Sequence, residues 1–285
     1  MREGIKKDLV LERVKGDTWC IVTGSGRIPL YLKDRQNAVM IDSGLKRPDR
    51  EPLLALLDKE EIHITSLLTS HFHRDHVGNH KTLREKYGCK IYMSPYTEAV
   101  CGDSINLKSG GYESFFMAKA RGGSFSCPAD EIILRTDETV CASGAEFKIL
   151  HLPGHAQEQM GFVTPDGVAY LADTILTEDL LRAVRIPYCT YCMKDLEAKA
   201  SVLEMHYDVY ILAHNGVVPG TEIHALAEKN IRNMHEKIDM VEGLLMEKPL
   251  TLEELAIAAM KKTGGDLTNP VKVFGAQRNV QVVLE

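Results

Sequence analysis

The chain of 285 residues lacks the features of several specialised protein classes. No apolar run approaches the roughly 20 residues that a membrane-spanning helix needs. Residues 1–11 are charged and have no apolar core of the kind found in signal peptides. The seven cysteines are odd in number and scattered from Cys20 to Cys192, so they do not suggest the disulfide framework of a small secreted domain. These absences predict a cytoplasmic protein that does not associate with a membrane.

An excess of basic residues is absent as well. The net charge is −6, whereas a general surface for nucleic acids or other polyanions normally needs a positive excess. The composition, 44% hydrophobic and 26% charged, is that of an ordinary soluble globular protein. We therefore expect a small-molecule substrate and consider a nucleic acid partner unlikely. The length suits one large domain, alone or with a small appendage.

The first two-thirds of the chain alternates short apolar runs with amphipathic stretches, which is the pattern of an α/β architecture. The apolar runs predict strands at residues 18–22, 37–41, 66–69, 90–93, 146–150, 161–164, 168–172 and 209–213. The amphipathic stretches predict helices at residues 51–57, 77–87 and 193–205. The turn Pro165-Asp166-Gly167 predicts that the strands on either side of it form a hairpin.

Residues 101–128 do not fit this alternation. They contain two glycine pairs, Gly110-Gly111 and Gly122-Gly123, with the apolar patch Phe115-Phe116-Met117 between them. We interpret the segment as an excursion from the core, either a lid over a site or a plain surface loop.

From residue 221 onward the strand signals stop, and helices are predicted at residues 222–247, 251–262 and 271–284. Thr251 and Glu254 have the spacing of a capping box that begins the second of these helices. The three helices resemble the start of a winged-helix unit without its wing. Residues 221–285 contain eight Lys or Arg and ten Asp or Glu, a net charge of −2, which disfavours DNA reading. We expect a helical appendage that serves packing or the formation of a homodimer.

The stretch His71-Phe72-His73-Arg74-Asp75-His76, which we call the histidine cluster, places three imidazoles and a carboxylate within six residues. If the preceding apolar strand continues through the cluster, His71 and His73 lie on one face, because strand side chains alternate. Asp75 and His76 then lie where the chain enters the next helix. Nitrogen and oxygen donors presented to one small volume are what zinc or another borderline divalent metal needs. The cluster therefore predicts a metal site.

Three later donors each follow an apolar strand. His155 comes after the turn Pro153-Gly154, Asp173 follows the strand at 168–172, and His214 follows the strand at 209–213. Folds of the α/β class gather their sites beyond the carboxyl ends of strands. We therefore expect these three side chains to complete the metal site.

The order of these motifs resembles that of the metallo-β-lactamase superfamily, in which an Asp after an early strand precedes HxHxDH and then His, Asp and His. The early Asp is here Asp42 in Ile41-Asp42-Ser43-Gly44, and the resemblance extends from about residue 18 to 220. It implies a four-layer αβ/βα sandwich with the metals at one edge between two sheets. Residues 1–220 would form this catalytic domain, and residues 221–285 a small C-terminal helical appendage.

The resemblance also implies which residues hold two divalent metal ions. By this resemblance, the first ion would be held by His71, His73 and His155. The second ion would be held by Asp75, His76 and His214. Asp173 would bridge both ions, and Asp42 would accept hydrogen bonds that orient the site. We assign no metal to His80 or His151. Zinc is the expected ion, and the same donors also suit iron and manganese.

Two divalent ions about 3.5–4 Å apart can share a water and lower its pKa toward neutrality. The resulting hydroxide would attack an electrophilic centre, and Asp75, besides acting as a ligand, would orient it or carry a proton to the leaving group. The similarity is greatest to the glyoxalase II-like and lactamase-beta-like hydrolases, which act on thioesters, esters or lactones. We therefore predict a metal-dependent hydrolase of a small ester, thioester or lactone.

Three alternatives stay open beside this prediction. One is an endoribonuclease or phosphodiesterase of the same fold. Another is a mononuclear-iron persulfide dioxygenase, which needs only two His and one Asp. The third is a non-catalytic binding protein that has kept the fold. The complete set of ligand types counts against the last two.

Residues 188–193 and the excursion at 101–128 are expected to contact the substrate. Tyr188 or Tyr191 would either donate a hydrogen bond to a developing oxyanion or simply pack. Cys189-Thr190-Tyr191-Cys192 is a CxxC motif, which in isolation suggests redox or zinc chemistry. Because no second Cys/His pair is nearby, the sequence assigns this motif no role.

Overall fold

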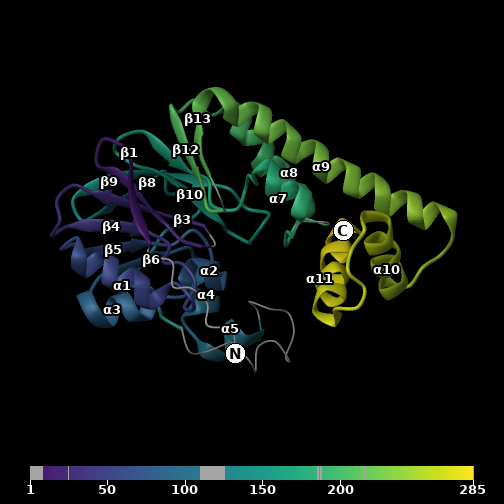
Figure 1. The fold of residues 1–285 in the computed structure, drawn as a ribbon, viewed down its shortest axis with the longest axis horizontal. Helices are drawn as coiled ribbons and strands as arrows, with labels where there is room; N and C mark the ends of the chain where they lie inside the picture. Colours follow the sequence, from purple (N-terminus) through teal and green to yellow (C-terminus); the bar gives the residue numbers. More distant parts are fainter. Residues whose placement is uncertain are drawn as a thin grey trace.

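In the computed structural model, which describes residues 9–284 except 25, 110–125, 185, 187 and 215, the strands form two sheets (Figure 1). The first sheet contains, in spatial order, β1 (Val10–Lys15), β2 (Thr18–Val22), β3 (Arg27–Leu32), β4 (Ala38–Ile41), β5 (Ile64–Leu68), β6 (Lys90–Met93) and β7 (Glu131–Ile132). The second contains, in spatial order, β13 (Gly216–Pro219), β12 (Val209–Leu212), β11 (Val168–Tyr170), β10 (Met160–Val163), β9 (Ala145–His151) and β8 (Thr139–Ala142).

Both sheets contain parallel strand pairs that bring carboxyl ends to the same edge. β4 and β5 run parallel in the first sheet, and β11 and β12 run parallel in the second. Two backbone hydrogen bonds join the sheets, from Arg27 N to Ala213 O at 2.7 Å and from Met160 N to Ser70 O at 2.9 Å. The residues that follow β4, β5, β11 and β12 are thereby held close to one another.

The helices are α1 (Arg50–Lys59), α2 (Arg74–Val77), α3 (His80–Tyr87), α4 (Pro95–Cys101), α5 (Ser104–Ser109), α7 (Glu178–Ala183), α8 (Cys192–Ser201), α9 (Gly220–Glu247), α10 (Leu252–Thr263) and α11 (Pro270–Gln281). Short 3₁₀ turns follow α8 and α11, at Val202–Glu204 and Val282–Leu284. Among the described residues, no helix is long and apolar enough to cross a membrane.

The core is divided into layers by the alternation of side chains along each strand. In β4, Met40 packs with Leu53 of α1, whereas its neighbour Ile41 packs with the second sheet. In β12, Ile211 faces the first sheet, whereas Leu212 packs in the cluster that includes α8 and α9. Adjacent strand residues point to opposite faces, so both sheets are buried on both sides. The order helices, sheet, sheet, helices is the four-layer αβ/βα sandwich that we predict, and the prediction is confirmed.

The C-terminal helices form an appendage to the sandwich. Figure 1 shows α9 as a long helix that leaves the second sheet, with α10 and α11 folded back beneath it, and α11 contacts residues 186 and 188. Thr251 Oγ1 accepts a hydrogen bond from Glu254 N, and the Glu254 carboxylate accepts one from Thr251 N, so the predicted capping box is present. Apolar side chains of α9, α10 and α11 form a separate cluster around Leu255 and Val280. The boundary at residue 220 stays a prediction, and α9 begins at Gly220.

The largest local difference from the predicted elements is in the helix expected at residues 77–87. It is divided into α2 and α3, with Gly78 and Asn79 between them. A Cβ atom on Gly78 would lie 2.4 Å from Lys46 N and 2.5 Å from Gly44 O, so the neighbouring turn packs directly on its backbone. Asn79 Nδ2 also donates to the carbonyl oxygens of Ser43 and Leu45. These tertiary contacts interrupt the helix.

Several short strands are not predicted from the sequence, namely β1, β3, β7, β8 and β13. In β3, Pro29 lies opposite Cys20 of β2, although proline disfavours a strand interior. Of the excursion at 101–128, residues 101–109 include the end of α4 and all of α5, and residues 110–125 lie outside the described residues.

Candidate metal centre

The histidine cluster lies in a loop and a short helix. β5 ends at Leu68, so the expectation that the strand continues through His71 and His73 is wrong. The chain turns because His73 caps α2: His76 N and Val77 N both donate to His73 O, at 2.9 and 3.0 Å. Asp75 and His76 therefore lie within α2 itself. The four donors still converge, because the turn brings α2 back over the end of β5.

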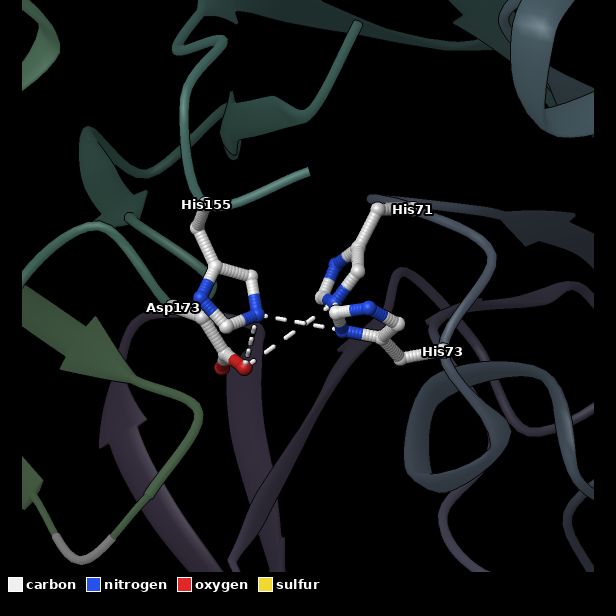
Figure 2. A group of neighbouring side chains, drawn as sticks. All are labelled: His71, His73, His155 and Asp173. Atoms are coloured by element: carbon white, nitrogen blue, oxygen red, sulfur yellow. Dashed lines mark hydrogen bonds and ion pairs between the residues drawn. The ribbon is translucent and has the colours of Figure 1, made fainter. Parts of the chain in front are cut away.

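The first group of donors consists of His71, His73, His155 and Asp173, shown in Figure 2. His73 Nδ1 lies 2.9 Å from His71 Nε2 and 3.1 Å from His155 Nε2. Asp173 Oδ2 lies 3.1 Å from His155 Nε2 and 3.9 Å from His71 Nε2. These nitrogen and oxygen atoms all lie within 4.8 Å of one another, so one cation could contact all four side chains.

The second group consists of Asp75, His76 and His214, whose donor atoms also lie within 4.8 Å of one another. His214 Nε2 lies 3.5 Å from Asp75 Oδ2, and His76 Nε2 lies 4.0 Å from the same oxygen. Asp75 is the most accessible of the three, with 29% of its side chain exposed. This group could hold a second cation beside the first.

Asp173 lies between the two groups. Its Oδ2 faces the first group, whereas its Oδ1 lies 3.5 Å from His76 Nε2 and 3.5 Å from His214 Nε2. The carboxylate is 6% exposed and follows β11 through Ala172, a non-glycine residue with φ 47°. The strained turn at Ala172 aims both oxygens inward, so each oxygen serves a different group.

The chemistry of the donors fits a pair of divalent cations. His76 Nε2 and Asp173 Oδ1 are buried and have no hydrogen-bond partner among the described residues. A buried polar atom without a partner lowers the stability of the folded protein. A cation bound between His76 Nε2 and Asp173 Oδ1 would give both atoms a partner. Imidazole and carboxylate donors without a thiolate suit zinc, iron and manganese.

Asp42 anchors the centre through four hydrogen bonds. Its Oδ1 accepts from Ser70 N at 2.8 Å, and its Oδ2 accepts from Ser70 Oγ at 2.6 Å and from the Tyr170 hydroxyl at 2.7 Å. The same Oδ2 lies 2.8 Å from His76 Nδ1, which fixes that ring with Nε2 toward the second group. Ser70 and Tyr170 are missed by the sequence reasoning, because neither belongs to a motif and Tyr170 reaches Asp42 only across the two sheets.

Electrostatics favour the metal-binding protonation states of His71, His73 and Asp173, whereas they favour a protonated ring at His76, which would release that proton on binding a cation. Burial lowers the pKa of His71 and His73 well below the usual value, and neighbouring imidazoles lower it further, so both rings are neutral. Burial would also lower the pKa of His76, but the carboxylates of Asp173 and Asp42 raise it well above the usual value. Although burial opposes its charge, the imidazoles of His76 and His155 keep the pKa of Asp173 well below the ordinary range.

The two histidines that the sequence leaves without a metal have other partners. His80 is fully buried, with Nδ1 2.7 Å from Ser43 Oγ and Nε2 2.8 Å from Thr69 Oγ1. Burial lowers the pKa of His80 to about 4, so it is neutral at pH 7. His151 is exposed, and its Nε2 lies 2.9 Å from Asp137 O. Neither residue belongs to the donor groups.

A pocket of about 350 Å³ opens onto both groups of donors. One wall is apolar and comes from α7 and its flanks, with Leu176, Leu180, Leu181 and Val184. No residue of α7 is buried, so its leucines face the pocket rather than a core. Met234 of α9 completes the apolar side. The pocket is thus lined by apolar side chains of α7 and α9 and by the side chains of the two donor groups.

Tyr188 connects the C-terminal helices to the centre. Its ring lies 5.2 Å from the rings of both His73 and His155, and its carbonyl oxygen lies 3.1 Å from His155 Nδ1. Arg278 of α11 stacks on the other side, with Cζ 3.9 Å from the centre of the Tyr188 ring. The Nε atom of Arg278 is buried without a hydrogen-bond partner among the described residues. Sequence reasoning missed Arg278, because no motif surrounds it.

Of the segments expected to contact substrate, residue 188 lies in this pocket and Tyr191 does not. Tyr191 is 48% exposed and lines a second, larger cavity of about 800 Å³ on the other side of the turn that carries His155. The described residues of 101–128 do not line the pocket of the metal centre.

Comparison with known proteins gives consistent matches over this region. The family model described as "Metallo-beta-lactamase superfamily" matches residues 30–214. The hydroxyacylglutathione hydrolase GloC of Haemophilus influenzae is 25% identical over 193 residues, which cover 66% of this chain and 84% of that protein. A hydroxyacylglutathione hydrolase of Rhodopseudomonas palustris is 25% identical over 136 residues, 47% of this chain and less than half, 43%, of that protein.

Solved structures agree in fold. A metallo-beta-lactamase family protein of Thermus thermophilus superposes with a TM-score of 0.68 at 17% identity, covering 97% of this chain and 92% of that chain. The FEZ-1 metallo-beta-lactamase of Legionella gormanii superposes with a TM-score of 0.64 at 15% identity, covering 81% of this chain and 95% of that chain. At these identities the likeness concerns the fold alone.

Proposed function

Because this chain belongs to the metallo-beta-lactamase superfamily, we propose that it is a hydrolase in which two divalent metal ions act together on a thioester. The observation that carries the proposal is Asp173, whose two oxygens face two separate donor groups. A single-ion enzyme would leave the donors of Asp75, His76 and His214 without a purpose. The preference for a thioester comes from the relatives named hydroxyacylglutathione hydrolase.

In this proposal His71, His73 and His155 hold the first ion, and Asp75, His76 and His214 hold the second. Asp173 contacts both ions. When bound, such ions supply hydroxide at neutral pH and stabilise negative charge on a carbonyl oxygen. Zinc is the expected metal because it is typical of the superfamily, although the same donors also suit iron and manganese.

The remaining steps are carried out by the side chains of the chain itself. The partly exposed carboxylate of Asp75 orients the nucleophile and transfers its proton to the departing thiolate. Asp42 holds His76 and the Ser70 turn in place, so that the donors need no rearrangement during the reaction. The leucines of α7 bind the apolar part of the acyl group and exclude bulk water from the carbonyl.

Arg278 supplies a positive charge beside the pocket. Arg278 is not among the residues that line the pocket and its Nε is buried, so contact with an anionic group on the thiol part of the substrate requires the Tyr188 ring to move aside. Through this contact, we expect the enzyme to prefer thioesters whose thiol carries a carboxylate over neutral thioesters.

The substrate proposal is tested with a panel of four substrates. They are a thioester whose thiol part carries a carboxylate, the same thioester with that carboxylate converted to a neutral amide, a lactone, and single-stranded RNA. We expect hydrolysis of both thioesters, and about a tenfold rise in KM for the anionic one alone when Arg278 is replaced by alanine, because one charge-assisted contact is lost. Lys272→Ala is the matched control, since Lys272 lies on the same helix, is 60% exposed and pairs with Asp266. RNA cleavage without thioester turnover would replace this proposal with the nuclease alternative.

Asp42 provides a graded test of the proposed ligands. Asp42→Asn should lower metal affinity about 10- to 100-fold, because partners that orient metal-binding histidines have effects of this size. Tyr170→Phe removes only one of the donors to Asp42, so a smaller loss is expected. Competition with a chromogenic chelator measures both affinities. Equal affinities in wild type and Asp42→Asn would show that Asp42 does not support the centre.

A further inference from the structure

The CxxC motif lies directly behind the metal centre. Cys192 is the first residue of α8, and Cys189 precedes it by three residues. Both thiols are buried, at 2% and 5% exposure, and both are free. They interact with each other, because a hydrogen bond from the Cys189 thiol lowers the pKa of Cys192, while the same contact and burial raise the pKa of Cys189. Of the two thiols, Cys192 is therefore the more readily deprotonated, and the amino end of a helix also stabilises its thiolate.

A buried acid lies one turn further along α8. Asp195 is 1% exposed and forms an ion pair with Lys199, which is itself 6% exposed. Its Oδ1 has no hydrogen-bond partner among the described residues. The carboxylate and the ammonium both act electrostatically on the two thiols. The ion pair with Lys199 accounts for one oxygen of Asp195. The other accepts no hydrogen bond from a thiol among the described residues, so proton transfer to it requires the Cys189 side chain to move toward it.

A third metal site does not explain the motif. Within the part of the chain that the structure describes, the two groups of the metal centre are the ones in which three or more donors lie within 4.8 Å of one another. Cys189, Cys192 and Asp195 do not form such a group. Two adjacent thiols beside a buried carboxylate are instead the elements of dithiol chemistry.

The turn between the cysteines is bonded to the turn that carries His155. Thr190 N, Thr190 Oγ1 and Tyr191 N all donate to Gly154 O, at 2.8, 3.0 and 3.2 Å. Gly154 has φ +139°, and a Cβ on it would lie 2.2 Å from Asp195 Cα, so the two backbones are in direct contact. The residue before the motif, Tyr188, holds His155 Nδ1 with its carbonyl oxygen. A change of geometry at the cysteines would therefore move His155, a proposed metal ligand, through the hydrogen bonds to Gly154 O and through the contact of Tyr188 O with His155 Nδ1.

We propose that Cys189 and Cys192 form a reversible dithiol–disulfide site and that the disulfide displaces Tyr188 and His155, which weakens the metal centre. The second half of this inference rests on the proposed function, whereas the first half does not. Thr190 and Tyr191, which lie between the cysteines, line the cavity of about 800 Å³, whereas the two buried cysteines do not. A small disulfide bound there therefore reaches Cys192 only when the turn opens locally.

The oxidation is a thiol–disulfide exchange with a small external disulfide. The Cys192 thiolate attacks one external sulfur, which forms a mixed disulfide and releases one external thiolate. Cys189 gives its proton to Asp195 and attacks Cys192 Sγ, which forms the Cys189–Cys192 bond and releases the second external thiolate. The two released thiolates take up the two protons of the cysteines. Two cysteine thiols are thus oxidised while one external disulfide is reduced to two thiols.

The experiment equilibrates the purified, metal-loaded protein in glutathione buffers of increasing oxidised fraction. Remaining thiols are then alkylated and located by peptide mass spectrometry. We expect one internal disulfide between Cys189 and Cys192, reversed by dithiothreitol. Cys189→Ser should instead retain glutathione on Cys192, and Asp195→Asn should slow disulfide formation about 100-fold, because a proton acceptor is removed. Cys141, an exposed thiol on β8, serves as the control for non-specific modification.

The effect on the centre is measured in the same samples. Oxidation should lower metal affinity and hydrolysis about 10- to 100-fold, the range seen when a partner of a metal-binding histidine is lost. Cys192→Ser should keep the activity of the reduced protein in every buffer. Absence of the internal disulfide refutes the inference whatever the hydrolytic activity is. A disulfide that leaves metal affinity unchanged refutes the link to His155. Absence of hydrolysis in the reduced protein refutes the proposed function. The effect of the disulfide on His155 is then judged from metal affinity alone.

Discussion

Replacement of Asp173 by alanine is expected to lower kcat/KM at least about 1,000-fold and to reduce the bound metal from about two ions per chain to one or none. Its two oxygens are the contacts shared by both donor groups, with Oδ2 facing His155 and Oδ1 facing His214. Metal ions supply several kcal/mol of charge stabilisation in a hydrolytic transition state, and about 4 kcal/mol corresponds to a factor of 1,000.

Steady-state hydrolysis and elemental analysis of the purified variant measure the two effects. Asp179→Ala is the matched control, because Asp179 is a carboxylate six positions away whose side chain is 93% exposed. A melting curve shows whether the Asp173 variant is folded. Two ions per chain in a folded Asp173→Ala protein would contradict the bridging role, and retained hydrolysis would contradict the use of the centre.

Removal of the metal ions is expected to abolish hydrolysis and to lower the melting temperature by about 10–20 °C. A ligand present at 100 times its Kd stabilises the folded state by about 2.7 kcal/mol, so two ions together contribute about twice that. For a domain of this size, each kcal/mol corresponds to about 2–4 °C. Part of this stabilisation comes from the buried atoms His76 Nε2 and Asp173 Oδ1, which have no hydrogen-bond partner among the described residues when no metal is bound.

The measurement compares melting curves and activity before dialysis against a chelator, after it, and after zinc is restored. His71→Ala is the informative control, because its first donor group is incomplete and its melting temperature should respond less to the chelator. If chelation removes the metal, as verified by elemental analysis, and neither activity nor melting temperature changes, the proposed centre plays no part in either.

The alternation of strands and helices was largely predictable because it is a local property. The apolar runs at β2 and β6 coincide with the predicted strands, and Thr251 with Glu254 begins α10 as expected. The errors occur where distant segments intervene. Gly78 and Asn79 end α2 because the Ser43–Leu45 turn packs on them. Glycine followed by asparagine permits such a break, but the packing that enforces it comes from a distant segment.

The types, order and spacing of the metal-binding candidates are properties of the sequence alone. HxHxDH followed by His155, Asp173 and His214 was enough to predict one site, because the donors of metals belong to few residue types and follow strand ends. The sequence also assigns no metal to His80, and in the structure its ring nitrogens contact Ser43 and Thr69.

The tertiary structure alone decided how these donors are positioned and supported. It placed the two oxygens of Asp173 toward different groups, brought Tyr170 across the sheets to Asp42, and stacked Arg278 on Tyr188. It also packed the CxxC turn against Gly154. Each of these contacts joins residues far apart in the chain. Their distances depend on how the sheets and the C-terminal helices pack together, and no local pattern of residues encodes that packing.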